Sequence, residues 1–170
     1  DLSKKFVVGV FGRNCERKQQ YRVIEALAKV KSSIGDDDIL AYFHCARRGY
    51  WHLDEIAHDL GVQDQVIFPA DYQDETRGVK NRCIVNEDDN IRKNDNEKTP
   101  EKTIGFPESF GYVERINCCD LVINAANCGD YEHIILEAQA CGIPLAHTDD
   151  QGIMTEAMGP AAIKLKTLDI

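Results

Sequence analysis

Residues 129–144 read Gly-Asp-Tyr-Glu-His-Ile-Ile-Leu-Glu-Ala-Gln-Ala-Cys-Gly-Ile-Pro, and this stretch is the most informative part of the chain. It predicts a loop that enters a short helix over 131–141, a stop at Gly142 and Pro144, and then an apolar strand over 145–148. A helix that follows a strand and a loop presents free backbone N–H groups and the positive end of its dipole. The stretch therefore predicts a phosphate site at the start of a helix.

Apolar runs of strand length alternate with helical patterns along the rest of the chain. Strands are expected over 6–11, 39–45, 65–69, 121–125, 145–148 and 161–164, and helices over 14–33, 52–60, 110–119, 131–141 and 154–158. This alternation indicates βαβ crossovers. The predicted fold class is α/β, with one Rossmann-like domain over 1–170 built on a doubly wound, mostly parallel sheet. The chain begins without Met and enters a strand almost at once, so we expect it to be part of a longer protein.

A long charged insertion interrupts the alternation. Residues 73–107 include an Asn-rich and acid-rich run over 86–98, and a structureless loop of that length is unusual inside a compact domain. The segment is either a solvated insertion or an element that contacts a partner or an acceptor. The sequence leaves both roles open.

Composition limits the classes of partner. The chain has 170 residues and a formal net charge of −9, so it lacks the basic surface that nucleic-acid binding needs, although a few local cations can hold a phosphorylated small molecule. No run reaches the roughly 18 apolar residues that span a bilayer, so no transmembrane segment is expected. The seven cysteines are an odd number without a Cys-x-x-Cys pair, which predicts reduced, buried thiols and a cytoplasmic location.

Two cations follow the first expected strand. Arg13 lies at the carboxyl end of that strand and Lys18 in the opening of the first helix, at the sheet edge where doubly wound folds bind ligands. An Arg fork and a Lys point charge could converge on a diphosphate. The alternative is a pair of solvated surface cations. Spacing alone favours the alternative, because Arg17 and Arg22 lie nearby and are equally plausible.

An acid stands inside the apolar helix pattern of the opening stretch. Glu137 lies in Ile-Ile-Leu-Glu-Ala, where a carboxylate must be paired, hydrogen-bonded or turned towards a cleft. It could accept two ribose hydroxyls, or it could form a buried ion pair with Arg or Lys. The residues alone do not decide between these roles.

The order of several motifs resembles one enzyme family. These motifs are Gly12-Arg13-x4-Lys18, Val66-Ile-Phe68, Asp120-Leu-Val122, Leu136-Glu-Ala-x-Ala-Cys-Gly-x-Pro144 and Gly152-x3-Glu156. Together they resemble the C-terminal, donor-binding domain of family 4 retaining glycosyltransferases with the GT-B architecture. The resemblance covers nearly the whole chain except 73–107, and it stops before the closing helices of the family. A dinucleotide-binding oxidoreductase is disfavoured, because no Gly-x-Gly-x-x-Gly follows the first strand.

This resemblance implies a substrate and roles for particular residues. A nucleoside-diphosphate sugar would be the donor, and the sugar would be transferred with retention to an acceptor held by an N-terminal GT-B domain absent from this chain. Arg13 and Lys18 would hold the diphosphate and stabilise the leaving group, while Glu137 would bind the ribose. Such enzymes usually need no metal cofactor, since protein cations and a helix dipole stabilise the charge. The five His residues show no metal-binding spacing, which agrees.

The same resemblance implies further donor contacts. Backbone amides around Tyr131, Glu132 and His133 would complete the phosphate site, and Phe68 would lie beside the base. The His133 side chain could reach the sugar or cap the helix start.

The chain departs from the family pattern in this loop. Gly129 stands where the family has a Glu that contacts the transferred sugar, and Glu132 stands where a Gly is usual. Asp130 could supply the missing acid. The loss of this Glu affects donor specificity and turnover more than nucleotide binding. Because the acceptor-binding N-terminal domain is absent from these residues, the isolated chain is expected to bind the donor without turnover. The alternative function, favoured by Gly129 and the charged insertion, is a non-catalytic glycosyltransferase-like module that binds a nucleotide or a partner.

Four other polar residues are weaker candidates for a functional role. His44 is expected to be a satisfied core histidine on the second strand. Arg47 and Arg48 are expected to be solvated loop cations, with extra phosphate or base contacts as the alternative. Glu156 is expected to be a structural helix residue.

Overall fold

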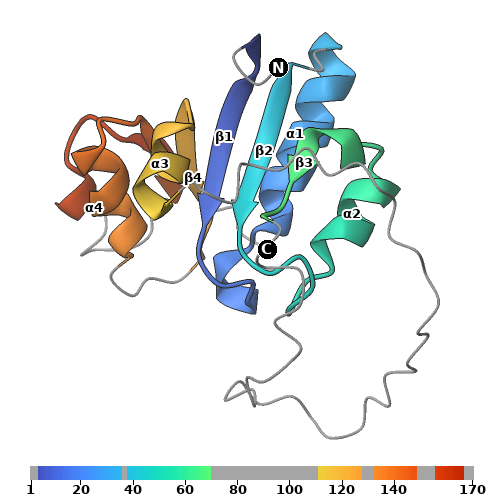
Figure 1. The fold of residues 1–170 in the computed structure, drawn as a ribbon, viewed down its shortest axis with the longest axis horizontal. Helices are drawn as coiled ribbons and strands as arrows, with labels where there is room; N and C mark the ends of the chain where they lie inside the picture. Colours follow the sequence, from blue (N-terminus) through green and yellow to red (C-terminus); the bar gives the residue numbers. More distant parts are fainter. Residues whose placement is uncertain (1–3, 36–37, 70–110, 128–131, 149–155, 167–170) are drawn as a thin grey trace, which may run out of the picture.

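The computed structural model describes residues 4–35, 38–69, 111–127, 132–148 and 156–166, which form a six-stranded parallel sheet flanked by helices (Figure 1). The strands are β1 (Phe6–Phe11), β2 (Ile39–His44), β3 (Val66–Ile67), β4 (Leu121–Asn124), β5 (Leu145–Thr148) and β6 (Ile163–Leu165). The helices are α1 (Tyr21–Ile34), α2 (Leu53–Asp59), α3 (Tyr112–Asn117) and α4 (His133–Ala140), with short 3-10 helices η2 (Glu16–Lys18) and η3 (Gln63–Gln65).

The strand order defines a doubly wound sheet. The order is β3-β2-β1-β4-β5-β6, and every neighbouring pair is parallel. The chain therefore builds outward from β1 in one direction and then from β4 in the other. The gap between the carboxyl ends of β1 and β4 is the switch point at which such sheets bind ligands. The predicted fold class is confirmed.

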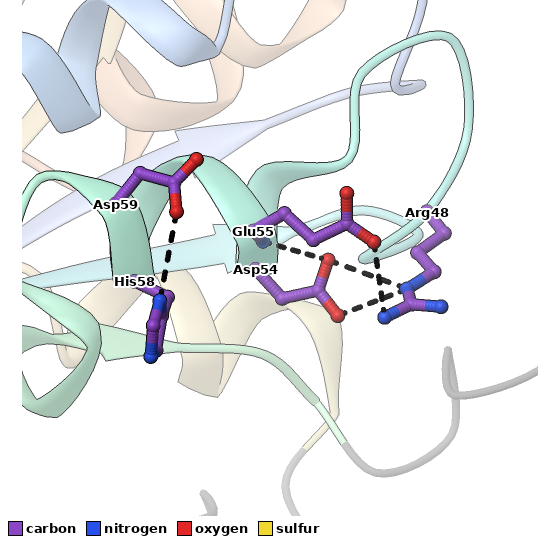
Figure 2. Close-up of a pocket in the computed structure, with 5 residues that line it drawn as sticks. All are labelled: Arg48, Asp54, Glu55, His58 and Asp59. Carbon is purple, nitrogen blue, oxygen red and sulfur yellow. Dashed lines mark hydrogen bonds and ion pairs between the residues drawn. The ribbon is translucent and has the colours of Figure 1, made fainter. Parts of the chain in front are cut away.

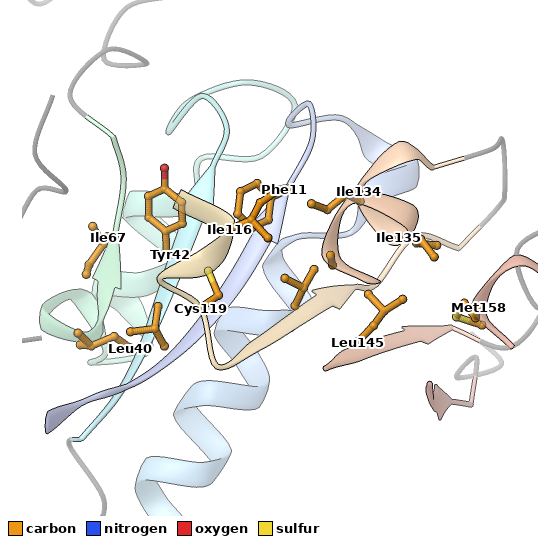
Figure 3. Packing of buried hydrophobic residues seen from close by; sticks show 13 residues of the cluster. Phe11, Leu40, Tyr42, Ile67, Ile116, Cys119, Ile134, Ile135, Leu145 and Met158 are labelled. Carbon is orange, nitrogen blue, oxygen red and sulfur yellow. The ribbon is translucent and has the colours of Figure 1, made fainter. Parts of the chain in front are cut away.

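Both faces of the sheet are buried, which explains the continuous apolar runs in the sequence. Along β1, Val7 and Phe11 pack into one core cluster while Val8 and Val10 pack into the other, as the two-residue period of a strand requires. The first cluster includes Ile116 of α3 and residues of α4 such as Ile135 (Figure 3). The second cluster includes Val23, Ile24 and Leu27 of α1 and Leu53 and Ala57 of α2.

The first helix begins later than predicted. The sequence suggested a helix over 14–33 capped by Asn14, but α1 starts at Tyr21 and is preceded by η2. Gln19 separates η2 from α1, because its left-handed backbone (φ 48°) ends the first of these helices. The Asn14 side chain bonds to the loop after β2 and makes no cap, so the helix prediction was wrong over these residues.

Other boundaries moved by a few residues. The predicted strand 65–69 narrows to Val66–Ile67, because Pro69 has no N–H to add to the ladder. The predicted strand 161–164 becomes Ile163–Leu165, and residues 156–158 are helical. The insertion 73–107 lies outside the described residues, so its role stays a prediction.

Three observations concern the predicted reduced cysteines and the transmembrane prediction. No disulfide joins any of the five cysteines that lie in the described ranges. Burial raises the pKa of the Cys119 thiol to about 12, so this thiol stays protonated at neutral pH. None of the described helices is long and apolar enough to cross a bilayer.

Candidate functional site

The loop after β1 is a closely packed turn at the switch point. Gly12 has a φ of 121°, which L side chains rarely adopt. A Cβ atom there would lie 3.1 Å from Lys18 Nζ, so the absence of a side chain lets the lysine pack over the turn. Gln20, which is 1% exposed, donates from Nε2 to the carbonyl oxygen of Arg13 at 2.6 Å. The turn is therefore fixed by its own residues.

Asn14 joins this turn to the loop after β2. Its Nδ2 donates to the carbonyl oxygens of Trp51 at 2.7 Å and Ala46 at 3.1 Å, and its Oδ1 accepts from the Trp51 N–H at 3.0 Å. Gly49 packs so closely that a Cβ atom would lie 2.9 Å from Asn14 Cβ. Sequence reasoning assigned Asn14 to a helix cap and missed this role. The only signal was the position of an amide directly after a buried strand.

Three charged side chains meet at the start of α4. Glu132 accepts from Arg17 Nη1 through Oε1 at 2.6 Å, and its Oε2 accepts from Lys18 Nζ. Lys18 is 6% exposed and Glu132 is 8% exposed, so the lysine–carboxylate pair is buried. We call Arg17, Lys18 and Glu132 the charge cluster. It joins the loop after β1 to a helix more than one hundred residues further along the chain.

The charge cluster keeps Glu132 ionised. Burial alone would raise the pKa of this carboxyl group. Hydrogen bonds from Lys18 and Arg17, and the positive charges of both, outweigh burial and hold the pKa of Glu132 below its ordinary value. The cluster therefore carries two cations and one carboxylate at neutral pH, which leaves one net positive charge at the switch point.

The loop after β4 is held against the same region. The Ala126 N–H donates to Asn124 Oδ1 at 3.2 Å, and the Thr148 hydroxyl donates to the Ala126 carbonyl oxygen. One residue further on, the Asn127 N–H donates to the carbonyl oxygen of Arg17 at 2.9 Å. Backbone and side-chain bonds thus position η2 between the loops that leave β1 and β4.

An aromatic group lies beside the charge cluster at the carboxyl edge of the sheet. We use this term for Phe11, His44 and Tyr112. Their ring centroids are separated by 5.4 Å between Phe11 and His44, 5.8 Å between Phe11 and Tyr112, and 5.2 Å between His44 and Tyr112. Phe11 and His44 are register partners at the ends of β1 and β2. Sequence reasoning missed Tyr112, which follows the insertion and carried no signal.

Glu137 of α4 faces this aromatic group. Its Oε2 accepts a hydrogen bond from Tyr112 Oη at 2.8 Å, and the carboxylate is half-buried. Among the described residues it forms no ion pair with Arg or Lys, so the alternative of a buried ion pair is not realised there. Glu132 caps the start of α4, and Glu137 lies five residues further on, inside the helix. The start and the middle of one short helix therefore each place a carboxylate in the site, against Lys18 and Tyr112 respectively.

The remaining predicted site residues fall in several places. Arg13 is exposed on the turn after β1, and it is Arg17 that lies with Lys18 in the charge cluster. His133 is exposed at the first position of α4. Asp130 and Tyr131 lie outside the described residues, as does Gly129. Their predicted donor contacts therefore stay predictions.

The structure describes three other residues for which the sequence predicted a role: Phe68, Arg47 and His44. Phe68 is 6% exposed and stacks on Phe43 at 5.6 Å, and the Arg47 guanidinium lies 5.6 Å from its ring centroid. Phe68 belongs to the second core cluster, and the half-buried Arg47 packs over its ring, so Arg47 is less exposed than the predicted solvated cation. His44 is half-buried, and its Nδ1 lies 2.9 Å from Tyr42 Oη, as expected for a histidine with a satisfied ring nitrogen.

A shallow depression on α2 holds a different set of charges (Figure 2). It is lined by Arg48, Asp54, Glu55, His58 and Asp59. Arg48 Nε lies 3.0 Å from Asp54 Oδ2, and Arg48 Nη2 lies 3.4 Å from Glu55 Oε1. Arg48 is thus an exposed loop cation neutralised by acids, as predicted, and the acidic lining disfavours phosphate. No cluster of His, Cys, Asp and Glu suitable for a metal ion occurs in the described ranges.

Comparison with known proteins defines the class of the fold. No protein-family model matches the chain. No curated protein matches it either. Among solved structures, the chain is similar to WaaG, a glycosyltransferase involved in lipopolysaccharide biosynthesis, with a TM-score of 0.62 and 18% identity over 96% of this chain and 34% of that one. The chain therefore has the fold of a glycosyltransferase domain.

Two other solved structures show which part of a glycosyltransferase this chain is similar to. The C-terminal domain of the group 1 glycosyl transferase LpcC from Francisella tularensis has a TM-score of 0.56 and 16% identity, over 95% of this chain and 67% of that one. HepE from Anabaena, solved with UDP and glucose, has a TM-score of 0.62 and 20% identity, over 97% of this chain and 35% of that one. The chain thus spans about a third of the length of WaaG and HepE. At these identities the similarity establishes the fold.

Proposed function

We propose that this chain is the nucleotide-sugar-binding domain of a retaining GT-B glycosyltransferase resembling family 4. The observation that carries the proposal is the meeting of Lys18 and Arg17 with the start of α4 at the switch point of the sheet. A phosphate group needs converging cations and a helix N-terminus, and this edge of the sheet supplies both.

The diphosphate would bind at the charge cluster. Lys18 packs over Gly12 and contacts Glu132 at the start of α4. Arg17, on the same short helix η2, contacts the other oxygen of Glu132. The exposed Arg13 would close over the phosphate once the donor is present. When the sugar leaves, negative charge grows on the nucleoside diphosphate, and these fixed cations would stabilise it without a metal ion.

The ribose would bind at Glu137. Its Oε2 already accepts from Tyr112, and a carboxylate has further lone pairs that can accept the two ribose hydroxyls. The aromatic group beside it offers ring faces and edges to the nucleoside. HepE was solved with UDP and glucose, which supports a UDP-sugar as one candidate donor, and GDP-mannose is another.

The remaining parts of the reaction belong to the rest of the proposed enzyme. An N-terminal domain of the same protein would bind the acceptor, and transfer would retain the anomeric configuration. The chain described here would bind the donor without turnover. The odd number of cysteines without a Cys-x-x-Cys pair is our reason for proposing a cytoplasmic location.

Calorimetric titration with UDP, GDP and ADP tests the proposal. We expect saturable binding of at least one of them, weakened about tenfold or more in Lys18→Ala, because a charge-assisted phosphate contact is lost. Lys29→Ala, on the exposed side of α1, is the control and should bind as the native chain does. Binding that is absent for every nucleotide, or equal in the Lys18→Ala and native chains, would contradict the assignment.

A non-catalytic glycosyltransferase-like module is the second candidate. It is favoured by Glu132, whose carboxylate already pairs with both of the proposed phosphate cations, and by Gly129. Sugar-transfer assays on the full-length protein, with and without Gly129→Glu, separate the two. Transfer by the native full-length protein supports the enzyme, whereas transfer only after Gly129→Glu supports the module.

A further inference from the structure

We infer that Glu132 occupies the donor phosphate site from within, so that a nucleoside diphosphate binds only by displacing this carboxylate from Lys18 and Arg17. The inference rests on the proposed function and goes further, because it makes Glu132 a specificity-determining residue. Ligands that bring strong negative charge to the site can displace it, and ligands without phosphate cannot.

The first step is the position of the carboxylate. Glu132 is the residue that caps α4, with extended backbone angles (φ −98°, ψ 103°), yet its side chain makes no capping hydrogen bond to its own helix. A capping side chain at this position, most often Asp, Asn, Ser or Thr, accepts from the first N–H groups of the helix. Here the side chain turns away and bonds to η2 instead. The carboxylate is thus directed at the cations and away from its own helix end.

The second step is burial. Lys18 is 6% exposed, and a buried ammonium group needs a partner because water no longer solvates it. Glu132 meets that need in the structure. A diphosphate brought to Lys18 would meet a second anion at contact distance, and repulsion between the two anions favours the departure of the carboxylate.

The third step is the neighbouring residue. Arg17 bonds to the other carboxylate oxygen, Oε1, at 2.6 Å, so each oxygen of Glu132 has its own cation. Such two-point binding resembles the way in which a phosphate group is held by cations. The pKa of Glu132 is held below its ordinary value, so at neutral pH the carboxylate is ionised and competes with a nucleoside diphosphate for the two cations.

Removal of the Glu132 charge should raise the binding affinity of ligands that carry phosphate and of no others. Glu132→Gln keeps the size of the side chain and removes the charge. It should tighten UDP binding about tenfold or more, tighten UMP binding less, and leave uridine binding unchanged, because only phosphate competes with the carboxylate. GDP, GMP and guanosine form a parallel series. Glu25→Gln on the exposed face of α1 is the matched control and should change nothing.

Calorimetry on the native chain and both variants distinguishes the possible failures. Equal or weaker UDP and GDP binding in Glu132→Gln would overturn the inference and leave the proposed function standing. Absence of nucleotide binding in native, Glu132→Gln and Glu25→Gln proteins that all unfold cooperatively would overturn the proposed function itself. UDP or GDP binding that is present in the native chain and tighter in Glu132→Gln supports both.

A measurement on the native chain avoids dependence on the variant. The carboxyl carbon resonance of Glu132 reports its hydrogen bonds, and saturation with the tightest-binding nucleoside diphosphate should shift it. Glu25 provides the reference resonance, which should stay in place. A Glu132 resonance that does not move while the nucleotide binds would overturn the inference.

Discussion

Tyr112 donates a hydrogen bond from Oη to Glu137 Oε2 at 2.8 Å, which joins the first residue of α3 to the middle of α4. The Tyr112 ring also packs on Phe11 and His44 at the ends of β1 and β2. The hydroxyl thus fixes the proposed ribose-binding carboxylate relative to the sheet. Tyr112 acts through Glu137 and is a positioning residue.

Tyr112→Phe should weaken nucleoside diphosphate binding while leaving the fold in place. The ring contacts remain and one partly exposed hydrogen bond is lost, so we expect a cost of about 1 kcal/mol, or roughly fivefold in affinity. The loss should be smaller for a 2′-deoxy nucleotide, since that ligand lacks one of the hydroxyls that Glu137 would accept. Tyr50→Phe, at an exposed tyrosine, is the control. Equal losses for the ribo and deoxy ligands would argue against the positioning role.

Asn14→Ala should destabilise the chain more than an amide removed elsewhere. Three hydrogen bonds between the loops after β1 and β2 disappear, and the backbone groups of Trp51 lose partners in a part-buried position. We expect the free energy of unfolding in urea to fall by about 2 kcal/mol. Asn117→Ala, at the exposed end of α3, should cost little. Similar losses in both variants would show that the bridge between the loops contributes nothing.

The sequence predicted the parallel sheet that positions the site, because a buried strand is recognisable from its own run of apolar residues. Continuous apolar runs at 6–11 and 39–45, each followed by a helical pattern, were enough to expect a parallel sheet and its ligand-binding edge. The sequence also predicted that Glu137 has a polar contact or faces a cleft, because it is an acid inside an apolar helix, and it accepts a hydrogen bond from Tyr112. These inferences depend on neighbours in sequence.

The charge cluster could not be predicted in the same way. Spacing left Arg13, Arg17 and Arg22 equivalent, because the choice depends on the left-handed Gln19 that ends η2 and fixes which side chains face the switch point. The pairing of Lys18 with Glu132 also depends on the parallel register of β1 and β4, which no local pattern encodes. The available signal was an acid where the resembling family usually has Gly.

Stability should depend on the coupling between Lys18 and Glu132. Lys18→Met leaves the buried carboxylate with Arg17 alone, and removing one partner of a buried pair costs about 3 kcal/mol. The double variant Lys18→Met/Glu132→Gln should lose less than the sum of the two single variants, because the second change removes the group that the first left unpaired. A urea-unfolding double-mutant cycle measures this coupling. Additive losses would mean that the two groups do not interact in solution.

The pH dependence of stability should carry the signature of Glu132. Its pKa is lower in the folded chain than the ordinary value of 4.5, so the folded state binds fewer protons than the unfolded state as acid is added. The stabilising contribution is fully present above that value and is lost as pH falls through the folded pKa. The native chain should therefore lose stability below about pH 4.5 more steeply than Glu132→Gln, in which this group cannot titrate. Urea unfolding between neutral pH and the acid limit of folding measures both slopes. Identical slopes would mean that the carboxylate is not held by the two cations, and the displacement by nucleotide would then lose its basis.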